Sequence, residues 1–117
     1  MTIATITVIV LGLAALGGWL VGLLHINGKS PGVGLGVGHG FAALAGVILL
    51  ILAMGQLLTG TLPLVALVLM LASSLGGSLL FIMHLRNRPL PAFIILGHGT
   101  TSTVAFVLVL IRLIQVA

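Results

Sequence analysis

Four long apolar runs, at about residues 3–25, 33–55, 62–84 and 91–114, make up nearly the whole 117-residue chain. Each run has the roughly 20 residues that a helix needs to cross a hydrocarbon core of about 30 Å. Hydrophobic residues form 61% of the sequence, Asp and Glu are absent, and the mean hydropathy is +1.50, so the chain cannot present a soluble surface. We therefore expect an all-α integral membrane protein, a four-transmembrane-helix bundle forming the single domain 1–117.

The chain contains an internal repeat, in which residue n corresponds to residue n + 59. Residues 16–25 return as residues 75–84, and the Gly-His-Gly of residues 38–40 returns as residues 97–99. All four histidines of the protein fall in this repeated frame, and the two histidines of each copy are 14 positions apart. The histidines are therefore the first candidates for function.

Each repeat, about residues 1–58 and about residues 59–117, contains two of the apolar runs. Both copies should then enter the membrane in the same direction, which is the parallel kind of repeat related by a pseudo-two-fold axis along the membrane normal. We expect two tandem helical hairpins joined by the uncharged linker 55–63.

The cations predict an orientation. Lys29, Arg86 and Arg88 lie in the two hairpin loops, whereas the opposite side has only Arg112. The positive-inside rule then puts the hairpin loops in the cytoplasm and both termini outside, and we expect a bacterial inner membrane. No Lys or Arg precedes the first run, so we interpret it as a retained helix and not as a signal peptide.

The four histidines are expected in one half of the membrane. His25 and His84 close the first and third runs, while His39 and His98 lie about two turns into the second and fourth, roughly 10 Å deeper. An imidazole within a membrane needs a hydrogen-bond or metal partner, and no carboxylate exists to supply one. This favours ligation of a metal or metallo-cofactor; the alternative is capping by loop carbonyls, Ser, Thr and lipid headgroups.

Small side chains share helix faces with the histidines, and we take them as candidate cofactor-binding positions. They are Gly18, Gly22, Gly77, Ala42, Gly46 and Ser102. A planar macrocycle needs such neighbours because its faces extend beyond the metal. Close helix packing in a membrane needs them equally.

Haem b, in one or two copies, is the favoured cofactor. Its iron takes one or two imidazoles, and its propionates could pair with Lys29, Arg86 and Arg88 at the same end of the bundle. A (bacterio)chlorophyll, a compact zinc or copper site, and no cofactor at all are the alternatives.

The histidines are expected to pair across the repeats, for example His25 with His98 and His39 with His84. A haem held within one hairpin would force two directly connected helices apart.

Several functions are excluded. Without cysteine there is no disulfide or iron–sulfur cluster, and without Asp or Glu there is no carboxylate-bridged di-iron centre. No nucleophile–base set or phosphate loop points to an enzyme. The net charge of +4 is explained by membrane topology and does not indicate nucleic-acid binding.

With its quartet His25, His39, His84 and His98 and their flanking glycines, the whole chain resembles the small four-helix membrane b-type cytochromes and cytochrome subunits. The resemblance implies electron transfer between quinol and another redox centre. It also implies membrane protein partners or a homo-oligomer, besides membrane lipids and a quinone. In cytochrome b the fourteen-residue spacing lies within single helices, whereas here a loop interrupts each interval. The rival interpretations are a pigment-binding photosynthetic subunit and a cofactor-free accessory subunit.

Overall fold

The computed structural model describes residues 1–56 and 58–117; position 57, in the predicted linker between the repeats, lies outside the described residues. The helices of the described part agree with the apolar runs to within two residues at each end. They are α1 (Ile3–Ile26), α2 (Val33–Met54), α3 (Thr61–Leu85) and α4 (Ala92–Val116).

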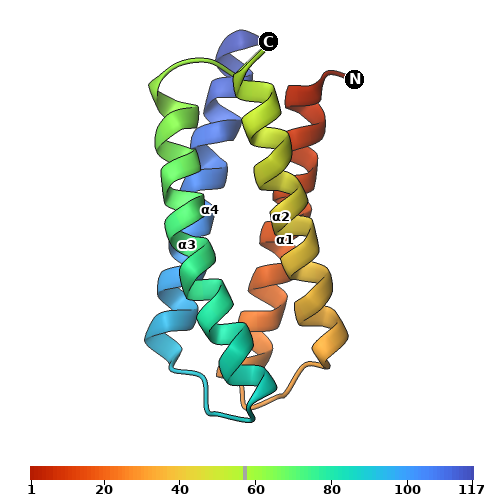
Figure 1. Cartoon of the computed structure of the whole chain (residues 1–117), viewed down its shortest axis with the longest axis vertical. Helices are drawn as coiled ribbons and strands as arrows, with labels where there is room; N and C mark the ends of the chain where they lie inside the picture. Colours follow the sequence, from red (N-terminus) through yellow and green to blue (C-terminus); the bar gives the residue numbers. More distant parts are fainter. Residues whose placement is uncertain (57) are drawn as a thin grey trace.

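The helices run alternately up and down (Figure 1). Both termini lie at one end of the bundle, and the α1–α2 and α3–α4 loops lie at the other, which we call the loop end. Neighbours in the sequence pack together and α1 also packs on α4, so α1 faces α3 across one diagonal and α2 faces α4 across the other. The bundle measures 43 × 23 × 19 Å.

All four helices are long and apolar enough to cross a membrane. Large apolar side chains cover the outer surface; Leu16 and its repeat counterpart Leu75, for example, are 71% and 76% exposed. Such a surface suits hydrocarbon and not water. The chain is therefore an integral membrane protein with an all-α fold.

The two halves of the bundle interior differ in chemistry. The apolar core lies toward the termini, where Leu50, Ala66 and Val109 from three different helices are fully buried. The four histidines occupy the other half, toward the loop end. Candidate chemistry is thus confined to one half of the membrane span.

The two hairpin loops begin with the same turn. Gly28 and Asn87, which are equivalent positions of the two repeats, both have positive φ, 73° and 52°, which glycine adopts freely and asparagine tolerates. The next residues bond back five positions: Lys29 N–H to the Leu24 carbonyl at 2.8 Å, and Arg88 N–H to the Met83 carbonyl at 2.9 Å. Each helix therefore ends in a Schellman-type motif.

This turn places one cationic residue three positions beyond the end of each helix that carries a histidine in its last turn. Lys29 and Arg88 occupy the equivalent position of the two motifs. The local geometry thus recurs from one repeat to the other, while a two-fold relation of the complete repeats stays a prediction.

Candidate functional site

The four imidazoles meet as two pairs, one across each diagonal of the bundle. His25 of α1 and His84 of α3 approach with 3.4 Å between Nε2 and Nδ1, and their ring centroids are 5.3 Å apart. His39 of α2 and His98 of α4 have centroids 6.1 Å apart and planes at 79°. All four side chains are half-buried.

Each pair takes one histidine from each repeat, as expected, but the expected partners are wrong. His25 meets His84 and not His98, and His39 meets His98 and not His84. The reason is depth: His25 and His84 both lie at helix ends, whereas His39 lies six residues, about 9 Å, inside α2. Diagonal helices bring positions of equal depth together, and those are the repeat equivalents.

The deeper pair is held by main-chain carbonyls. His39 Nδ1–H donates to the Ala14 carbonyl at 2.9 Å, and His98 Nδ1–H donates to the Ser73 carbonyl, also at 2.9 Å. Ala14 and Ser73 are again equivalent positions of the two repeats. A carbonyl can only accept, so each ring carries its proton on Nδ1 and leaves a lone pair on Nε2. Metal-ligating histidines usually show this arrangement.

Ser73 adds a polar cluster around His98 that has no counterpart at His39. Its hydroxyl lies 2.8 Å from His98 Nδ1 and 2.6 Å from the Ser102 hydroxyl, and it donates to the His98 carbonyl at 3.1 Å. Ser73 is only 6% exposed. Ser73 was not among the candidate residues from the sequence. The sequence feature that could have indicated it is its position four residues before Gly77 in the repeat.

Gly18 lies against the imidazole of His39, and Gly77 lies against that of His98. A Cβ at Gly18 would lie 2.6 Å from His39 Cε1, and a Cβ at Gly77 would lie 2.8 Å from His98 Cε1. Both distances are shorter than any normal contact, so these rings need glycine on the facing helix. These two candidate positions are thereby joined directly to the histidines.

Other predicted small positions pack helices together. A Cβ at Gly22 would lie 3.0 Å from Ile95, and one at Gly46 would collide with the side chain of Leu11. Ala42 is half-buried on α2. At Gly22 and Gly46 the neighbouring side chains already occupy the space, which is the packing role that the sequence left open.

In the shallower pair, His25 and His84, the hydrogen bonds all run in one direction, from His84 to His25 and from His25 to the backbone. His25 Nδ1–H donates to the Val21 carbonyl at 3.0 Å, so neutral His25 can only accept at Nε2. His84 Nδ1–H supplies that bond over 3.4 Å. The remaining nitrogen of the pair, Nε2 of His84, then carries a lone pair.

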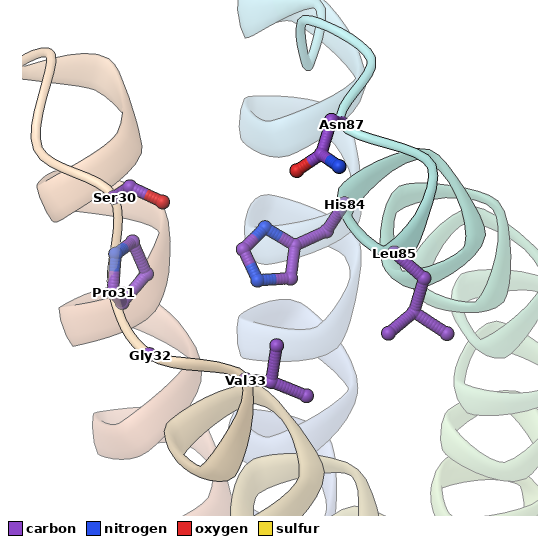
Figure 2. A pocket seen from close by; sticks show the side chains of 7 residues that line it. All are labelled: Ser30, Pro31, Gly32, Val33, His84, Leu85 and Asn87. Atoms are coloured by element: carbon purple, nitrogen blue, oxygen red, sulfur yellow. The ribbon is translucent and has the colours of Figure 1, made fainter.

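Two adjoining open hollows at the loop end reach this pair. The larger, about 550 Å³, is lined among others by His25, Lys29, Ser30, His84, Asn87 and Arg88. The smaller, about 430 Å³, lies between the segment 30–33 and the end of α3, with the His84 imidazole projecting into it (Figure 2). Of the three predicted cations, Lys29 and Arg88 line a hollow, whereas Arg86 lines neither of the two.

The two histidine pairs do not merge into one metal cluster. Within residues 1–56 and 58–117, no three side chains of His, Cys, Asp or Glu come together in a way that could hold a metal ion. The compact zinc or copper site with three or four imidazoles, one of the alternatives from the sequence, therefore does not form in this part of the chain.

Trp19, the single tryptophan, lies on α1 and contacts α4. Its Nε1–H donates to the Thr103 hydroxyl at 2.8 Å, and a Cβ placed on Gly99 would lie 3.4 Å from its ring. Thr103 in turn donates to the Gly99 carbonyl at 2.7 Å. Trp19 is thus a packing residue of the helix interface.

No family model, curated protein or solved structure matches this chain. The function is therefore inferred from the geometry of the site.

Proposed function

We propose that this chain is a membrane-embedded b-type haem protein that transfers electrons, in which His39 and His98 would hold the haem iron. The observation that supports this most is the protonation pattern of the deeper pair. Both rings give their Nδ1 proton to a backbone carbonyl, and both keep a lone pair on Nε2 for a metal.

The spacing of the two rings suits one iron. The two imidazoles would hold one iron between them, since a metal–imidazole nitrogen bond is about 2.0 Å long. The centroids of His39 and His98 are 6.1 Å apart. The two ligands would come from α2 and α4, which face each other across one diagonal of the bundle.

The residues on the other diagonal are small. Gly18 belongs to α1 and Gly77 to α3, and both are at the depth of the deeper pair. A macrocycle needs small residues at such positions, which supports the proposal; the imidazoles of His39 and His98 occupy the space beside these glycines, so both rings would have to move to admit it. When bound, haem supplies one-electron redox chemistry. The chain's own residues provide the two ligands, fix the ring tautomers and exclude water through the apolar core beyond them.

We propose one haem and not two. The nitrogens of His25 and His84 that face each other already share a hydrogen bond at 3.4 Å, and His25 Nδ1 is bonded to the Val21 carbonyl. A metal between these two rings would have to break that bond, whereas nothing comparable links His39 to His98.

The proposal extends to location and partners. We infer a bacterial inner membrane with the hairpin loops in the cytoplasm, from three loop cations against Arg112 on the other side. By analogy with b-type cytochromes, quinol or quinone would exchange electrons with the haem. Exposed Leu16, Leu75 and similar side chains suit contact with lipid or with other membrane subunits.

Absorption spectroscopy of protein purified from its native membrane tests the proposal. A sharp α band that appears on dithionite reduction supports it. An intense red or near-infrared maximum would instead indicate a (bacterio)chlorophyll. A featureless visible spectrum, also after haem is added during purification, would contradict the proposal and favour a cofactor-free accessory subunit.

A further inference from the structure

The larger loop-end hollow is lined by groups that suit an anion. Lys29 and Arg88 are cationic, Ser30 and Asn87 offer neutral donors, and His84 gains an N–H donor when protonated. Residues 1–117 include no Asp or Glu, so no carboxylate side chain among them can neutralise these cations. We define Lys29, Ser30, His84, Asn87 and Arg88 as the basic hollow.

The fold fixes the backbone at the two cationic residues of the basic hollow. Lys29 and Arg88 each follow a positive-φ residue and donate their backbone N–H to a carbonyl of the preceding helix, at 2.8 and 2.9 Å. They come from different hairpins, so a ligand that contacts both would bridge the two repeats. A fixed backbone loses less freedom on binding than a disordered loop that carries the same cations.

Apolar side chains border the same region. Leu90 lines the larger hollow, and Val33 and Leu85 line the smaller one, where they are 47% and 52% exposed. Free phosphate gains nothing from such neighbours, whereas a phospholipid would place its glycerol and acyl chains against them. The volumes of the two hollows, about 550 and 430 Å³, are in the usual range of ligand sites.

We propose that the basic hollow binds the phosphate group of an anionic phospholipid from the leaflet on the hairpin-loop side. Basic pockets between transmembrane helices bind anionic headgroups in this way. Neither His39 nor His98 lines the hollow, so this site does not depend on the haem proposal.

The test is lipid retention by the full-length protein in nanodiscs of mixed phosphatidylglycerol and phosphatidylcholine, counted by native mass spectrometry. The wild type should retain phosphatidylglycerol preferentially. The double variant Lys29→Gln/Arg88→Gln should lose roughly tenfold or more of that preference, because it removes both cations that line the hollow. Arg86→Gln, which removes a neighbouring cation outside both hollows, should retain it.

A second variant keeps the test valid if the double variant folds poorly. Asn87→Asp places a carboxylate in the basic hollow, and aspartate tolerates the positive φ of this position as asparagine does. It should also abolish the preference for phosphatidylglycerol.

Three results would overturn the proposal. One is an equal loss in Arg86→Gln, which would indicate nonspecific attraction to the loops. Another is full displacement of the lipid by millimolar inorganic phosphate, which would make free phosphate the ligand. The third is loss of lipid on loading with haem, which would assign Lys29 and Arg88 to haem propionates.

Discussion

His39 and His98 approach each other across the α2–α4 diagonal with their ring centroids 6.1 Å apart, and each donates its Nδ1 proton to a carbonyl of a neighbouring helix. Two neutral imidazoles that donate from Nδ1 both keep their lone pair on Nε2. Under the haem proposal, any substitution that moves either ring should therefore weaken metal binding at that nitrogen.

Replacement of Gly18 by alanine should displace the imidazole of His39. The new Cβ would lie 2.6 Å from Cε1, so the ring must move and weaken its bond to the Ala14 carbonyl. We expect a destabilisation of about 1–3 kcal/mol, typical of overpacking, and weaker haem binding. Thermal unfolding in detergent and haem titration measure the two effects.

Gly17→Ala is the matched control, because a Cβ at Gly17 meets nothing within 4 Å. It should be neutral or stabilising by up to ~1 kcal/mol through the higher helix propensity of alanine. Equal effects of the two substitutions would mean that the contact between Gly18 and His39 does not position the ring.

Ser73→Ala should loosen His98 without releasing it. The variant loses the hydroxyl bonds to Ser102 and to the His98 carbonyl but keeps the main-chain carbonyl that accepts from His98 Nδ1. We expect a loss of about 1 kcal/mol in stability with haem binding retained. Ser74→Ala, which removes a hydroxyl bonded to Met70 of its own helix, should change stability less. A larger effect at Ser74 would contradict the role given to Ser73.

Thr103→Val should be visible in tryptophan fluorescence. Trp19 is the single tryptophan, and its Nε1–H donates to the Thr103 hydroxyl at 2.8 Å. Loss of this acceptor should shift the emission to shorter wavelength and cost about 1 kcal/mol of stability. Thr100→Val, at an exposed position of α4, should leave the emission maximum unchanged. No shift in Thr103→Val would mean that the bond does not form in solution.

His25 and His84 should be energetically coupled. Removal of either one breaks the same 3.4 Å hydrogen bond, so the double variant His25→Ala/His84→Ala should lose less stability than the sum of the two single variants. We expect a coupling energy of about 0.5–1.5 kcal/mol, measured by thermal unfolding of all four proteins of the cycle. Strict additivity would show that the two rings do not interact.

Helix boundaries were predictable from the sequence because loops rich in Gly, Pro and cations interrupt the apolar runs within each repeat. The expected helix ends differ from the observed ends of α1, α2, α3 and α4 by no more than two residues. The depth of each histidine was equally predictable, since the fixed rise per residue of an α-helix determines how far His39 lies inside α2.

The pairing of His25 with His84 followed from depth, which separates these two histidines from the deeper pair. The helices that face each other across a diagonal, and the partners of the glycines, were not predictable in this way. Gly18 and Gly22 share a face of α1, yet one meets a histidine and the other Ile95, because the facing side chain sets the contact. The Ala14 main-chain carbonyl, which accepts the hydrogen bond from His39 Nδ1, could not be predicted from any side-chain type in the sequence.

The most direct test of haem ligation by the deeper pair is the reduced-minus-oxidised absorption spectrum of three proteins purified with added haem. These are the wild type, His39→Ala/His98→Ala and His25→Ala/His84→Ala. Ligation by His39 and His98 predicts a sharp α band in the wild type and in His25→Ala/His84→Ala, and its loss in His39→Ala/His98→Ala. No band in the wild type, or a band that disappears with His25 and His84 but persists without His39 and His98, would contradict it.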